Sequence, residues 1–104
     1  MNKTLALLLA ICPLWAHAGQ DFVVTQKGKA FSIATLNIKA GDKVAFRNDD
    51  TFAHNIFSLS DPMNFDLGTY PTGQSKTVVF TTPGKYEVEC AIHPEMKMIV
   101  NVKP

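Results

Sequence analysis

A thiol, an imidazole and a thioether stand three residues apart near the end of the chain, at Cys90, His93 and Met96. All three groups are soft or borderline metal ligands: thiolate and thioether favour reduced copper, and imidazole suits both of its oxidation states. Two histidines, one cysteine and a weakly bound methionine form the ligand set of an electron-transfer copper site. His54 lies earlier in the chain and can supply the second imidazole. The pattern predicts one copper ion, alternating between Cu(I) and Cu(II), bound by these four side chains.

The first eighteen residues have the organisation of a secretory signal peptide. Lys3 is followed by the apolar run of residues 5–15, and Ala16-His17-Ala18 offers a cleavage motif. The apolar run is shorter than the roughly 20 residues of a membrane-spanning helix. We therefore expect residues 1–18 to be removed on export to the periplasm, leaving a chain without a membrane span. Removal would also discard Cys12 and His17.

Residues 19–104 are long enough for one domain with one modest core. Within them Cys90 is the sole cysteine, so no internal disulfide can form, and a metal is a natural supplement to so small a core. His54 and His93 are the only histidines of this segment, too few for multicopper oxidases or nitrite reductases. Without Lys3, the chain has nine basic and nine acidic residues, and neither kind forms a charged block. This charge distribution gives no support to nucleic-acid binding.

Apolar residues recur at alternate positions, and Gly and Pro turns interrupt them at short intervals. This pattern predicts an all-β domain, a sandwich or small barrel of about seven to eight strands. The expected strands are 21–26, 35–39, 43–48, 54–57, 76–80, 85–90 and 97–102. Residues 58–73 are expected to be irregular, because they contain Pro62, Gly68, Pro71 and Gly73.

The strand at 85–90 has the clearest alternation. Tyr86, Val88 and Cys90 share one face, and the charged residues between them share the other. The period of two therefore places the Cys90 sulfur on the core side, at the end of a strand.

Several segments together resemble the cupredoxins, the small blue copper proteins, and the spacing of the Cys90 loop is most similar to the amicyanin-like members. The segments are Lys39-Ala40-Gly41-Asp42, Phe46-Arg47-Asn48-Asp49-Asp50, His54-Asn55, Pro83-Gly84-Lys85-Tyr86 and the loop 90–96. The resemblance implies a Greek-key β-sandwich in which His54, Cys90 and His93 are equatorial ligands and Met96 is axial. It also implies that the Asn55 side chain bonds the backbone beside the cysteine ligand.

Met98 leaves the fourth ligand open. Its spacing from His93 matches the longer plastocyanin-like loop, whereas its alternation with Val100 and Val102 is typical of a core residue in the last strand. We favour Met96 on spacing.

The resemblance implies a monomeric one-electron carrier between periplasmic redox proteins, such as a dehydrogenase or a c-type cytochrome. Docking would use an apolar patch around His93, formed by Phe52, Ala53, Pro71, Ile92 and Pro94. The same ligands could instead sequester or transfer copper, and sequence does not separate the two functions. A Cys-His pair can also serve as nucleophile and base, but no third orienting group is evident, so we predict that the protein is not an enzyme.

Overall fold

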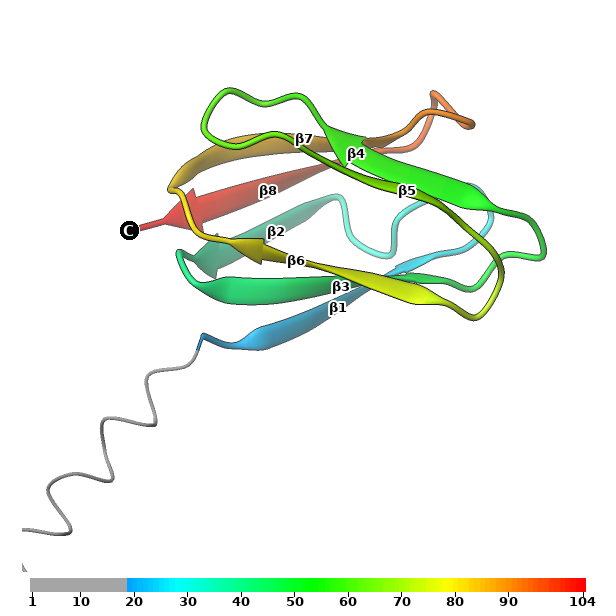
Figure 1. Ribbon diagram of the computed structural model, residues 1–104, viewed down its shortest axis with the longest axis horizontal. Coiled ribbons are helices and arrows are strands. Elements are labelled where there is room, and N and C mark those ends of the chain that lie inside the picture. The colour runs from blue at the N-terminus through cyan, green and yellow to red at the C-terminus, as the bar shows by residue number, and fades with distance from the viewer. Residues whose placement is uncertain (1–18) are drawn as a thin grey trace, which may run out of the picture.

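The computed structural model describes residues 19–104, and the expected signal peptide lies outside the described residues. Eight strands form two sheets packed face to face (Figure 1). One sheet has the order β1-β3-β6, and the other β2-β8-β7-β4-β5. The strands are β1 (Asp21–Gln26), β2 (Thr35–Lys39), β3 (Asp42–Asn48), β4 (His54–Ser58), β5 (Phe65–Tyr70), β6 (Ser75–Phe80), β7 (Gly84–Cys90) and β8 (Lys97–Lys103). The all-β prediction is confirmed.

The first two strands join different sheets: β1 pairs parallel with β3, and β2 pairs parallel with β8. All other strand pairs are antiparallel. No helix long and apolar enough to cross a membrane occurs in residues 19–104.

The core lies between the sheets and follows the predicted alternation. Val44 and Phe46 of β3 are fully buried, as are Tyr86 and Val88 of β7. Phe80 packs edge-on against Tyr86 with ring centroids 5.1 Å apart, which joins the two sheets through aromatic contact. Burial of alternate residues fixes the register of each strand, because a slip by one residue would turn the apolar face to solvent.

The prediction that residues 58–73 are irregular is wrong, because β5 lies within them and pairs with β4. Pro62 precedes β5, and Pro71 and Gly73 follow it, so these breakers bound the strand rather than interrupt it. Gly68 lies inside β5 with φ +74° at a bulge, where three steps along β5 face two along β4. The Gly68 amide donates to the Asp66 carboxylate at 2.8 Å, which stabilises the bulge.

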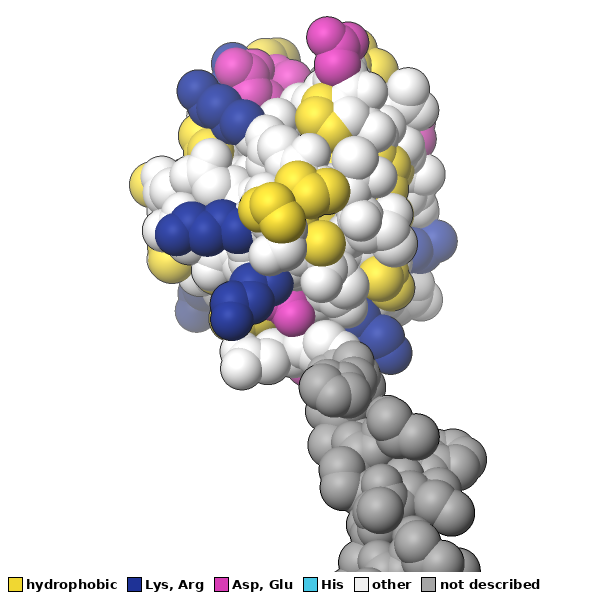
Figure 2. Space-filling model, turned by 90° about the vertical axis from the view of Figure 1, so that its left-hand side faces the viewer, with side chains coloured by type: hydrophobic (Ala, Val, Ile, Leu, Met, Phe, Trp, Pro, Cys, Tyr) yellow, Lys and Arg dark blue, Asp and Glu magenta, His cyan; other side chains and the backbone are white. Residues whose placement is uncertain are grey.

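The two ends of the sandwich differ. β4 begins and β7 ends at one of them, and the C-terminus lies at the other (Figure 1). Figure 2 shows the C-terminal end, where a few apolar side chains are surrounded by charged ones and no histidine is visible. His54 is the first residue of β4 and His93 follows the end of β7, so both lie at the opposite end.

Asp42 fastens the start of the described chain to the β2–β3 turn. Its carboxylate accepts hydrogen bonds from the main-chain amides of Lys39 and Gln20, both at 2.8 Å. The bond from Lys39, and then that from Gln20, lowers the pKa of Asp42 below its ordinary value, against the opposing effect of burial.

We expect Asp42→Asn to lower the urea midpoint of unfolding at pH 7. A carboxylate whose pKa is lower in the folded protein stabilises it fully above the unfolded-state pKa, near 3.8, and this contribution is lost as the pH falls through the folded-state pKa. The difference between wild type and variant should therefore shrink below about pH 4. Asp21→Asn, at an exposed position on β1, is the control. A difference that persists unchanged at low pH would contradict this role.

Candidate metal centre

Pairing between β4 and β7 brings the first histidine to the cysteine. His54 is the first residue of β4 and Cys90 the last of β7, and Ile56 lies opposite Cys90 in the antiparallel register. One residue past the end of β7, the Ala91 amide donates to the carbonyl of Asn55 in β4 at 3.3 Å. Two residues distant in sequence are therefore held side by side by backbone hydrogen bonds.

Three predicted ligands converge. His54 Nδ1 and His93 Nδ1 each lie 3.7 Å from Cys90 Sγ, and the three ligand atoms are all within 4.8 Å of one another. His54 and Cys90 are buried, whereas His93 is partly exposed. Two imidazole nitrogens and one thiol sulfur facing a common point match the equatorial donor set of an electron-transfer copper site. The residues present fit such an ion.

The Cys90 sulfur also accepts a hydrogen bond, from the main-chain amide of Asn55 at 3.3 Å. This bond restrains the sulfur beside the start of β4. The sequence predicted that the side chain of Asn55 would tie the two ligand segments together. The contacts described above come from its main chain, and the side-chain bond stays a prediction.

Met96 and Met98 are equally buried but occupy different places. Met98 lies opposite Val88 between β8 and β7, and it alternates with buried Val100, as a core residue does. The last pair of this register is Glu89 with Lys97, so the next residues outward on the two segments are Cys90 and Met96. The Met96 amide donates to the His93 carbonyl at 2.9 Å, which closes the loop.

Asp50 also belongs to the site, which its position in the sequence did not predict. Its Oδ2 lies 2.6 Å from His54 Nε2, and its carboxylate also accepts main-chain hydrogen bonds from Gly28 and Lys29. Burial would raise the pKa of Asp50, but the bond from His54 and the two amides outweigh it and hold that pKa below its ordinary value. The available sequence signal was only an acidic residue four positions before a histidine.

Phe52 contacts both histidines. Its ring centroid lies 5.4 Å from that of His54 and 5.2 Å from that of His93, and Lys29 Nζ stands 5.9 Å from the Phe52 ring. Phe52 is 38% exposed, so its ring covers the imidazole pair at the surface. Of the other predicted patch residues, Pro71, Ile92 and Pro94 are exposed and Ala53 is partly so.

Residues 20–103 match the family model described as copper-binding proteins of the plastocyanin/azurin family. The chain belongs to this family. Its cofactor is one copper ion, and the three converging side chains are where the described structure can hold it.

Among curated relatives, this copper protein is similar to amicyanin-alpha of Methylorubrum extorquens, with 33% identity over 79% of its own chain and 71% of the relative. Among solved structures, a purple cupredoxin from Nitrosopumilus maritimus superposes with a TM-score of 0.71 at 26% identity, over 80% of this chain and all of that one. A copper-containing nitrite reductase from Thermus scotoductus superposes with a TM-score of 0.75 at 29% identity, over 81% of this chain. The match spans only 22% of the reductase, so the resemblance concerns one part of that enzyme.

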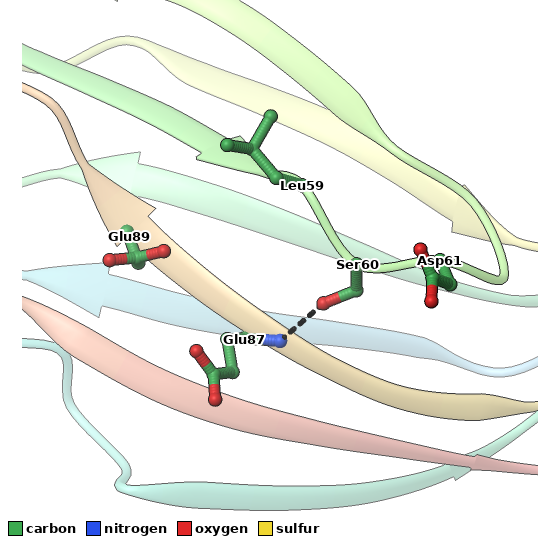
Figure 3. Close-up of a pocket in the computed structure, with 5 residues that line it drawn as sticks. All are labelled: Leu59, Ser60, Asp61, Glu87 and Glu89. Atoms are coloured by element: carbon green, nitrogen blue, oxygen red, sulfur yellow. Dashed lines mark hydrogen bonds between the residues drawn. The ribbon is translucent and has the colours of Figure 1, made fainter.

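This copper protein also has a surface pocket of about 270 Å³ (Figure 3). It is lined by Leu59, Ser60, Asp61, Glu87 and Glu89. Glu87 and Glu89 alternate with the buried residues of β7, so the pocket is on the outer face of the sheet. None of the residues that line the pocket belongs to the cluster of His54, Cys90 and His93.

We expect Phe52→Ala to lower the free energy of unfolding of the copper-free protein by about 1–2 kcal/mol, because two aromatic contacts are lost. His93 should also show increased ring mobility in NMR relaxation, since Phe52 covers it. Ile92→Ala is the matched control, because it truncates an exposed apolar side chain at the same end, and it should change stability by less than about 0.5 kcal/mol. Equal effects of the two variants would contradict the covering role of Phe52.

Proposed function

We propose that the protein is a one-electron carrier of the periplasm, in which His54, Cys90 and His93 bind copper and Met96 is the weak fourth ligand. The observation that carries the proposal is the convergence of His54 Nδ1, Cys90 Sγ and His93 Nδ1 at one end of the sandwich. Copper supplies a Cu(I)/Cu(II) couple, which changes by a single electron.

The protein's contribution is to keep these ligands in place. His54 and Cys90 stand at the ends of hydrogen-bonded strands and are buried, so neither can move far when the metal's charge changes. The Asn55 amide donates a hydrogen bond to Cys90 Sγ at 3.3 Å, which also restrains the sulfur. A site held in this way reorganises little during electron transfer, as a carrier requires.

His93 is the proposed route to a partner, because its ring is partly exposed whereas that of His54 is buried. The surrounding patch, with Phe52 and Ile92 exposed, would support a small and short-lived interface with a dehydrogenase or a c-type cytochrome. This function needs no substrate cleft and no catalytic group, in keeping with a monomeric protein that is not an enzyme.

Loading with Cu(II) tests the site. We expect the exported, purified protein to show an intense thiolate-to-copper charge-transfer band in the visible spectrum. Cys90→Ser should abolish this band, because a serine hydroxyl supplies no thiolate. A colourless wild type, or a band retained in Cys90→Ser, would contradict the proposed site.

Electron self-exchange, measured by NMR in mixtures of oxidised and reduced protein, then tests the function. Fast exchange supports a carrier. Slow exchange with tight copper binding would contradict it and favour sequestration or transfer of copper by the same ligands.

The two methionines can be separated by paired variants. Met96→Leu should change both the charge-transfer spectrum and the reduction potential, since leucine offers no donor to the metal. Met98→Leu should leave both nearly unchanged and cost less than about 1.5 kcal/mol of stability, because it conserves volume within the core. The reverse result would make Met98 the axial ligand.

A further inference from the structure

The carboxylate of Asp50 is held from two sides. Gly28 N donates to Oδ1 at 2.6 Å, Lys29 N lies 3.2 Å from Oδ2, and His54 Nε2 lies 2.6 Å from the same Oδ2. The side chain is 7% exposed. Both carboxylate oxygens are thus engaged by a main-chain amide, and the histidine contact is made from a fixed position.

The two amides come from one tight turn. Lys27 N donates to the Ala30 carbonyl at 3.0 Å, and Gly28 and Lys29 have φ values of +66° and +56°. Positive φ at both central residues is the requirement of a type I′ turn. Lys29 is the only non-glycine with positive φ in residues 19–104, so this left-handed conformation is unusual for the chain. In this conformation the successive main-chain amides of Gly28 and Lys29 both point toward one anion, the Asp50 carboxylate.

The turn and Asp50 are also joined through their backbones. Asp49 N donates to the Gln26 carbonyl at 2.9 Å, just before the turn, and Asp50 N donates to the Asn48 side chain at 2.9 Å. Tyr70 Oη lies 2.9 Å from Gln26 Oε1, which links this corner to β5. The carboxylate therefore has little freedom to turn away from His54.

We propose that Asp50 is a positioning residue of the copper site. By accepting the proton of His54 Nε2, its carboxylate leaves the Nδ1 lone pair free to face Cys90, and it places a fixed negative charge behind the ligand. The proposal rests on the proposed ligand role of His54. It makes the Lys27–Ala30 turn, remote from the Cys90 loop in sequence, a determinant of the site's redox properties.

The first test needs neither copper nor a variant. In the copper-free wild type, nitrogen-15 NMR of the His54 ring should show the proton on Nε2 and none on Nδ1. A neutral ring with its proton on Nδ1 would overturn the proposal, even if the copper-loaded protein has the expected band.

The second test separates charge from hydrogen bonding. Asp50→Asn removes the charge but keeps an acceptor oxygen, whereas Asp50→Ala removes both. Loss of the charge should disfavour Cu(II) relative to Cu(I) about tenfold, a rise in reduction potential of about 59 mV for one electron. Only Asp50→Ala should also give a mixture of His54 ring tautomers.

Asp49→Asn is the matched control. It makes the same charge change at the adjacent residue, whose carboxylate pairs with Arg47 Nε at 2.8 Å and is more exposed. A clearly smaller shift in Asp49→Asn than in Asp50→Asn supports the proposal. Equal shifts, or none in Asp50→Asn, would overturn it. If the Asp50 variants fail to fold by circular dichroism, the wild-type tautomer decides.

Failure of this inference differs from failure of the proposed function. A wild type without the charge-transfer band would reject the copper site itself. A normal band that is lost in His54→Ala, together with no effect of Asp50→Asn, would keep the site and reject only the role of Asp50.

Discussion

The antiparallel pairing of β4 with β7 is the constraint on which the site depends. It sets Ile56 opposite Cys90, the last residue of β7, and so brings His54, at the start of β4, close to Cys90 across a long stretch of sequence. The pairing is itself secured by burial, since Ile56 and Val88 have no exposed surface. Slippage by one residue would turn the cysteine sulfur away from the core, so the apolar pattern that folds the sheet also aims the thiol.

Much of this could be predicted from the sequence because it follows from local periodicity. Tyr86, Val88 and Cys90 alternate with charged residues, so the direction of the sulfur follows from strand geometry alone. The strand β5 could not be found in the same way. The position of β5 depends on its pairing with β4 through a bulge at Gly68. The number of Gly and Pro residues in the segment does not show whether they lie at the ends of a strand or interrupt it.

The role of Asp50 could not be predicted from the sequence for a related reason. Its partners are the amides of Gly28 and Lys29, which carry no side-chain signature, and a histidine that sequence reasoning had already assigned to the metal. Only the fold brings that turn to the carboxylate. The ligand atoms of a site can be predicted from residue type and spacing, whereas the groups that orient them are selected by tertiary contact and include backbone amides.

The two histidines are therefore not equivalent. His54 is buried and held by a carboxylate at Nε2, whereas His93 lies on a loop, is partly exposed and packs against Phe52. Rigidity on the buried side and access on the other suit a centre that must keep its geometry and still pass an electron outward. The charges can be counted in the same way: if Cys90 binds copper as a thiolate, then Cys90 and an ionised Asp50 would supply two buried negative charges against Cu(II), and reduction would leave one of them unbalanced. Because unbalanced charge is costly in a poorly solvated interior, the carboxylate behind His54 would then favour the oxidised state.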